Sequence, residues 1–91
     1  MSVWEVRVKK KVLKGLDKLP EGIRTRFAAL KTDLELGGLN PGKRWKNYSK
    51  LGPKKHHCHL TYSYVACWEE LDGKIKIMEV YYAGSREKAP Y

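Results

Sequence analysis

The segment with the most potential for chemistry is His56-His57-Cys58-His59. Side chains alternate along a strand, so in an extended segment His57 and His59 share one face and Cys58 lies on the other. Two imidazoles on one face can begin a zinc site, but a structural zinc site needs four ligands. Because imidazoles titrate near pH ~6.5, the pair could instead transfer protons or, when charged, hold a phosphate. We favour proton transfer over zinc binding, and over two surface histidines without a role.

The second cysteine, Cys67, is expected on the same sheet face as Cys58. If Leu60 pairs with Val65 in a hairpin, Cys58 lies opposite Cys67. That register predicts a small buried cross-strand pair, or a disulfide under oxidation. In a reducing compartment two cysteines are more typical of free thiols.

The segment Gly84–Tyr91 carries the other candidate groups. Arg86 has a permanently charged, planar guanidinium that fits a phosphate. Tyr91 can stack on a base or donate its phenolic hydrogen. Taken alone, the segment also fits a frayed tail, so its place relative to the histidines decides between the two interpretations.

The charge distribution indicates a polyanionic partner. Nineteen Lys and Arg against ten Asp and Glu give a formal net charge of +9. No acidic residue occurs between Glu35 and Glu69. Such a basic stretch is typical of nucleic-acid binding, although it can also serve only as a solvated face. The candidate RNA-binding residues are Lys43, Arg44, Lys46, Lys50, Lys54 and Lys55.

Hydrophobic periodicity predicts the elements that must position these groups. Residues 3–9 alternate like a strand with one buried face. Residues 10–19 have apolar side chains at helical spacing. A second helix is expected from Pro20-Glu21 to Gly37-Gly38, with proline in the first turn and glycine at the end. Its apolar stripe is formed by Ile23, Phe27, Leu30 and Leu34.

Three further strands are expected at residues 55–60, 65–69 and 74–83, after a loop with the turn Asn40-Pro41-Gly42. Leu71-Asp72-Gly73 predicts the second hairpin turn. The chain therefore has the order strand-helix-helix-strand-strand-strand. This order predicts an α+β fold, with a helical hairpin packed on one face of a mainly antiparallel four-stranded sheet and the last strand central.

Length and composition fit one small domain over residues 1–91. Hydrophobic residues make up 42% and charged residues 32%, which excludes a disordered chain. No apolar run reaches the ~18–20 residues needed to span a bilayer. The N-terminal residues show no signal-peptide core, so we expect a cytoplasmic protein with no membrane association.

Several features resemble the RelE/ParE superfamily of toxins from bacterial toxin–antitoxin systems. They are the order of elements, the loop Asn47-Tyr48-Ser49-Lys50-Leu51-Gly52, and the ending Tyr82-Ala83-Gly84-Ser85-Arg86-Glu87 with a nearby Tyr91. The strongest local match is Gly-Ser-Arg-Glu, which resembles the Gly-x-Arg-Glu that ends the last strand in RelE-type members. The similarity covers essentially the whole chain and implies a RelE-like fold.

The resemblance to the RelE branch implies an endoribonuclease that cuts messenger RNA, usually in the ribosomal A site, without a metal or other cofactor. The ribose 2′-hydroxyl attacks the adjacent phosphorus and expels the 5′-oxygen, which leaves a 2′,3′-cyclic phosphate. By resemblance, Arg86 matches the transition-state arginine. Tyr91 resembles the family tyrosine, one residue nearer to the glycine. His57 and His59 occupy the strand positions where RelE has lysines.

The chain departs from the RelE pattern at Tyr64-Val65, where members usually carry an arginine; Lys54 or Lys55 could supply that phosphate contact. The expected partners are mRNA, the ribosome with its rRNA, and a cognate acidic antitoxin. Trp45 and Tyr48 are candidate antitoxin contacts unless they pack in the loop. The alternative functions are a ParE-type inhibitor of DNA gyrase and a basic RNA-binding module without catalysis.

Overall fold

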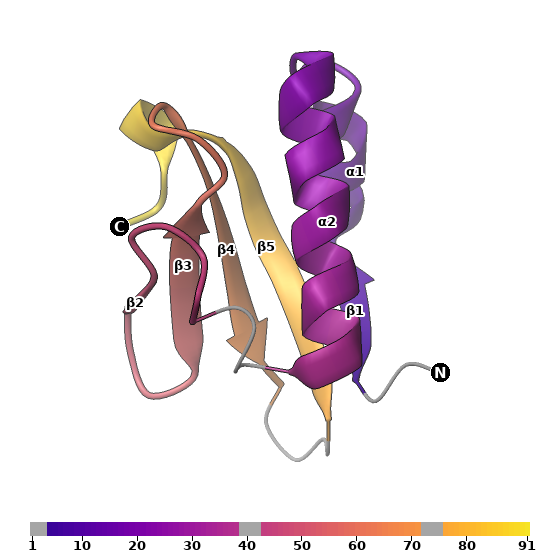
Figure 1. Ribbon diagram of the computed structural model, residues 1–91, viewed down its shortest axis with the longest axis vertical. Helices are drawn as coiled ribbons and strands as arrows, with labels where there is room; N and C mark the ends of the chain where they lie inside the picture. The colour runs from indigo at the N-terminus through magenta and orange to yellow at the C-terminus, as the bar shows by residue number, and fades with distance from the viewer. Residues whose placement is uncertain (1–3, 39–42, 72–75) are drawn as a thin grey trace.

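The computed structural model describes residues 4–38, 43–71 and 76–91 (Figure 1). The predicted turn at residues 40–42 and part of the predicted turn at residues 71–73 lie outside the described residues. The described elements, in chain order, are β1 (Glu5–Val8), α1 (Lys10–Leu16), α2 (Glu21–Gly37), β2 (Ser49–Lys50), β3 (Lys55–His59), β4 (Tyr64–Glu70), β5 (Ile77–Ser85) and a 3₁₀ turn, η1 (Arg86–Lys88).

The strands form one sheet in the order β1-β5-β4-β3-β2. β1 runs parallel to β5, and the other neighbouring strands are antiparallel. The predicted α+β class, the mainly antiparallel sheet and the central position of the last strand are confirmed. The predicted number of four strands is wrong, because the two residues of β2 pair with His56 and His57. Two residues are too few to show a strand period.

Both helices cover the same face of the sheet (Figure 1). α2 begins directly after Pro20 and is capped at its C-terminal end by Gly38, whose φ of 66° is accessible to glycine at little cost. α1 is shorter than predicted and ends at Leu16, although Leu19 still packs against the core. The predicted α2 stripe is confirmed, since all four of its apolar residues are buried.

The core lies between the helices and the sheet face that they cover. Trp68 of β4 and Met78 of β5 are fully buried there beside Leu30 and Leu34 of α2. Burying a leucine or similar side chain contributes about 1.5–3 kcal/mol, so this layer supplies most of the stability of the fold. Within the described residues, no helix combines the length and apolar character needed to cross a membrane.

The register of the β3–β4 hairpin differs by one residue from the prediction. His57 pairs with Cys67 and Cys58 with Ala66, because the connection begins with Leu60 N–H donating to the Tyr64 carbonyl. Shifting a register by one residue moves a side chain to the other face of the sheet. Cys67 therefore shares the face of His57, and the predicted cross-strand cysteine pair is wrong. Both thiols are free and buried, and burial raises the pKa of each to about 12.

The chain after β5 turns back over the sheet. In Figure 1 this segment bends past the end of β5 and descends on the side of the sheet away from α1 and α2. Arg86 N–H donates to the Ser63 carbonyl (2.8 Å), which fastens η1 to the β3–β4 connection. The segment that could have been a frayed tail is thus folded against the sheet.

Candidate functional site

His57 and Tyr91 meet on the sheet face opposite the helices. Their ring centroids are 4.6 Å apart. Ser49, which pairs with His57 across β2 and β3, places its Oγ 2.9 Å from His57 Nδ1. His57 is only 7% exposed, because Ser49 and Tyr91 pack against its ring. The prediction that His57 faces away from the core is consistent with its place in the sheet, but the folded C-terminal segment covers the ring.

His59 lies beside His57 on the same strand, with ring centroids 5.9 Å apart. Its backbone N–H donates to the Lys46 carbonyl, so the basic loop, which is the segment with Lys43, Arg44 and Lys46 before β2, lies against the end of β3. The side chain is 8% exposed, and its Nδ1 has no hydrogen-bond partner within the described part of the chain. The predicted pair of histidines therefore forms one contact group with Tyr91.

Burial sets the protonation of this group. Desolvation lowers the pKa of His57; a hydrogen bond with the Ser49 backbone partly opposes this effect, and the neighbouring His59 reinforces it. His57 is therefore neutral at pH 7. Desolvation raises the pKa of Tyr91, helped by Cys67 and opposed by the positive charge of Arg86, so the phenol keeps its proton. An imidazole that can accept a proton thus contacts a phenol that can donate one.

Arg86 lies at the edge of this group rather than inside it. Its guanidinium carbon is 5.0 Å from the centroid of the Tyr62 ring. Both side chains line a hollow of about 250 Å³ with Tyr64 and Ser85. Arg86 is exposed, and its charge reaches the Tyr91 phenol strongly enough to influence its pKa. The guanidinium can therefore face an anion at the solvent side of the group.

The Gly-Ser-Arg sequence explains how the chain turns at this point. Gly84 is buried, and a Cβ there would lie 3.0 Å from Tyr82 Oη. Tyr82 Oη–H uses this space to donate to the Ser85 carbonyl (2.6 Å). The hydrogen bond fixes the end of β5 immediately before Arg86.

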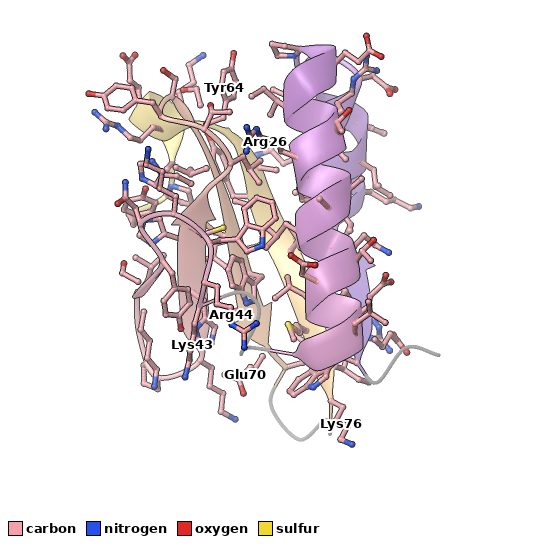
Figure 2. All side chains as sticks on the ribbon, viewed as in Figure 1. Arg26, Lys43, Arg44, Tyr64, Glu70 and Lys76 are labelled. Carbon is pink, nitrogen blue, oxygen red and sulfur yellow. The ribbon has the colours of Figure 1, made fainter. Side chains whose placement is uncertain are left out.

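The predicted RNA-binding cations are all exposed but do not form one cluster. Figure 2 places Lys43 and Arg44 towards the end of the molecule where Glu70 lies, away from Tyr64. Lys46 adjoins His59 through the backbone. The other cations of the set lie on or beside the β2–β3 edge, and they are Lys50, Lys54 and Lys55. Lys55 Nζ is 5.7 Å from the centroid of the Tyr81 ring.

A buried polar network beside the basic loop was not predicted. His56 is 2% exposed and packs against the rings of Tyr48 and Trp68, each with its centroid 5.8 Å from that of the imidazole. Its Nδ1 is 2.6 Å from Tyr48 Oη, and its Nε2 is 2.9 Å from Glu70 Oε2. This fits a tautomer in which Nε2–H donates to the carboxylate and Tyr48 O–H donates to Nδ1. The signal in the sequence was the position of His56 on the apolar side of β3.

Trp45 and Tyr48, the candidate antitoxin contacts, are partly buried and pack against the core. Trp45 Nε1–H also donates to Asp33 Oδ2 of α2 (2.9 Å), which ties the loop to the helix. Their packing in the loop is the alternative that the sequence left open. In the described part of the chain, no three His, Cys, Asp or Glu side chains are grouped closely enough to hold a metal ion.

Comparison with known proteins identifies similar folds only among solved structures. No protein-family model and no curated protein matches the chain. Among solved structures, the chain is similar to one in the crystal structure of the archaeal RelE–RelB complex from Pyrococcus horikoshii OT3, with a TM-score of 0.71 and 21% sequence identity. The similarity covers 98% of this chain and 100% of the other. This chain therefore has a RelE-like fold.

Proposed function

We propose that this protein is the toxin of a toxin–antitoxin system and cleaves mRNA on the ribosome by a metal-independent reaction. The observation that carries the proposal is the contact between a neutral, buried imidazole and a protonated phenol, 4.6 Å apart, with Arg86 at their solvent side. Cleavage by a ribose 2′-hydroxyl needs a base, an acid and a cation, and these three side chains supply one of each.

In the proposed reaction, each of the three side chains has one role. His57 accepts the proton of the 2′-hydroxyl as that oxygen bonds to the adjacent phosphorus. The bond from phosphorus to the 5′-oxygen breaks, and this oxygen takes the proton of Tyr91. The products are a 2′,3′-cyclic phosphate and a 5′-hydroxyl, and the proton returns from His57 to Tyr91 through water. Arg86 balances the charge that accumulates on the pentavalent phosphorus.

Access to His57 depends on Tyr91. The Tyr91 side chain covers the histidine while remaining 56% exposed itself. The ribose reaches the imidazole only when the phenol ring turns aside, and the bound RNA then occupies the space between them. His59, with one unpaired nitrogen beside His57, is the alternative donor for the leaving oxygen in that arrangement.

The partners follow from charge and from the similar structure. The formal net charge of +9 favours binding to rRNA and mRNA phosphates and to an acidic antitoxin. The similar archaeal structure is a complex of RelE with RelB, which supports a protein partner for this chain as well. We expect the antitoxin to be acidic and to cover the basic surface.

The test is to map mRNA 5′ ends in cells after brief induction of the wild type and of Arg86→Ala. Loss of one preorganised charge-stabilising donor lowers the cleavage rate about 100-fold or more. Lys88→Ala is the matched control, because Lys88 is an exposed cation of the same 3₁₀ turn. Its cleavage should stay within about twofold of the wild type.

Wild-type toxicity of Arg86→Ala at equal expression would contradict the assigned site. Inhibited supercoiling by gyrase with unchanged mRNA ends would instead identify a ParE-type inhibitor. RNA binding with a steep salt dependence but no cyclic-phosphate product would identify a binding module without catalysis.

A further inference from the structure

We propose that a pocket between α2 and the β3–β4 connection binds a nucleotide of single-stranded RNA next to the cleaved linkage, with Arg26 as its phosphate ligand. The inference rests on the proposed function in one respect, that the ligand is RNA. The pocket has a volume of about 320 Å³ and is lined by Arg26, Trp45, Lys46, His59 and Tyr62 among others. This volume lies at the lower end of the ~300–1,000 Å³ range of ligand sites.

Two cations of the pocket have no carboxylate partner among the described residues. Arg26 is exposed on α2, and Figure 2 shows its side chain directed from the helix towards the end of the sheet where Tyr64 lies. Neither Arg26 nor Lys46 forms a salt bridge within residues 4–38, 43–71 and 76–91. Two unneutralised charges from different elements on one pocket wall favour an anionic ligand.

His59 also lines the pocket, and one of its ring nitrogens lacks a partner among the described residues. His59 is only 8% exposed, and its Nδ1 has no hydrogen-bond partner in the described part of the chain. Buried side-chain nitrogens are nearly always paired, so an unpaired one in a residue of the pocket lining is a group that a polar ligand would satisfy. Because His59 also contacts His57, this ligand lies next to the candidate reaction site.

The aromatic side chains favour RNA over an acidic peptide. The indole of Trp45 is held by its hydrogen bond to Asp33, and the Tyr62 ring is 73% exposed. Flat rings between cations are typical of single-stranded RNA sites, where bases stack and phosphates bind the charges. Tyr62 also lines the hollow of Arg86, so the two depressions share a wall. An RNA strand can therefore run from Arg86 past Tyr62 to Arg26.

The experiment measures binding of a fluorescein-labelled 12-nucleotide RNA in which every 2′-hydroxyl is methylated, so that it cannot be cleaved. Fluorescence anisotropy gives the Kd at salt concentrations from 50 to 200 mM. Arg26→Gln should weaken binding about five- to tenfold at 100 mM salt and reduce the slope of log K against log salt by about 0.7, as expected for one lost single-strand phosphate contact. The matched control is Arg24→Gln, an exposed arginine of the same helix that does not line the pocket.

Equal effects of the Arg26 and Arg24 substitutions would overturn the proposal. It would also be overturned if Arg26→Gln weakened binding of a 20-residue poly-glutamate and left RNA binding unchanged, because the pocket would then serve an acidic protein. The readout does not depend on cleavage. Suppose that the wild type left mRNA ends intact but that Arg26→Gln, unlike Arg24→Gln, still reduced the slope of log K against log salt. The RNA-binding pocket would then be supported, and the proposed nuclease activity would be contradicted.

Discussion

Replacing His56 with phenylalanine tests how much the buried network beside the basic loop contributes to stability. Phenylalanine keeps a flat ring packed against Tyr48 and Trp68 but removes both hydrogen bonds of the imidazole. A neutral hydrogen bond contributes about 0.5–1.5 kcal/mol, and one to a carboxylate about 1.5–3 kcal/mol. The Glu70 side chain is 30% exposed, so water replaces part of its lost bond. We expect the free energy of unfolding to fall by about 2–3 kcal/mol.

The assay is urea unfolding followed by tryptophan fluorescence, which reports on Trp68 next to the substituted ring. For a chain of this size, a loss of about 2–3 kcal/mol corresponds to a decrease in Tm of about 8–24 °C. Tyr48→Phe alone removes one hydroxyl and should cost about 0.5–1.5 kcal/mol. The double variant should cost less than the sum of the two, because either single change already breaks the bond between Tyr48 and His56.

Two results would refute this reasoning. An unfolding free energy of His56→Phe within about 0.5 kcal/mol of the wild type would mean that ring packing alone accounts for the buried histidine. Additivity of the two substitutions within about 0.3 kcal/mol would mean that Tyr48 and His56 do not interact.

Two further predictions concern stability. A Cβ at Gly38 would lie 2.3 Å from Trp4 Nε1 on a backbone with φ of 66°, so Gly38→Ala should lower the free energy of urea unfolding by about 1–3 kcal/mol. Gly22→Ala, which has open space in α2, should instead stabilise by up to about 1 kcal/mol, and equal effects at the two positions would contradict the packing argument. Because the pKa of His57 is lowered in the folded state, the unfolded chain binds more protons below pH ~6.5, so stability should decrease as the pH falls from 7.5 to 5. His57→Gln should reduce that decrease, and an unchanged pH dependence would show that the burial of His57 has no such effect.

The helices and the histidine face could be predicted because both depend on local periodicity. The four apolar residues of α2 recur on one helical face, and all four are buried. His57 and His59 share a sheet face because alternation along a strand does not depend on its neighbours. Local pattern is sufficient for features of this kind.

The register of β3 and β4 could not be predicted, because it depends on how the chain turns between Leu60 and Tyr64. A difference of one residue moved Cys67 from the predicted face to that of His57. The network of His56 was missed for a related reason. Its two hydrogen-bond partners lie 8 and 14 residues away, one in the loop and one at the end of β4. Contacts at these separations depend on the tertiary arrangement.

The parallel pairing of β1 with β5 also affects when the sheet can be completed during synthesis. Glu5 pairs with Ile77, so β1 finds its partner only after the long segment between β1 and β5 has been made. Contacts between residues so distant in sequence form late and slow folding. Arg86 and Tyr91 follow that partner strand and emerge later still. A nascent copy therefore lacks both the complete sheet and the groups proposed for catalysis until β5 and the residues after it have been made.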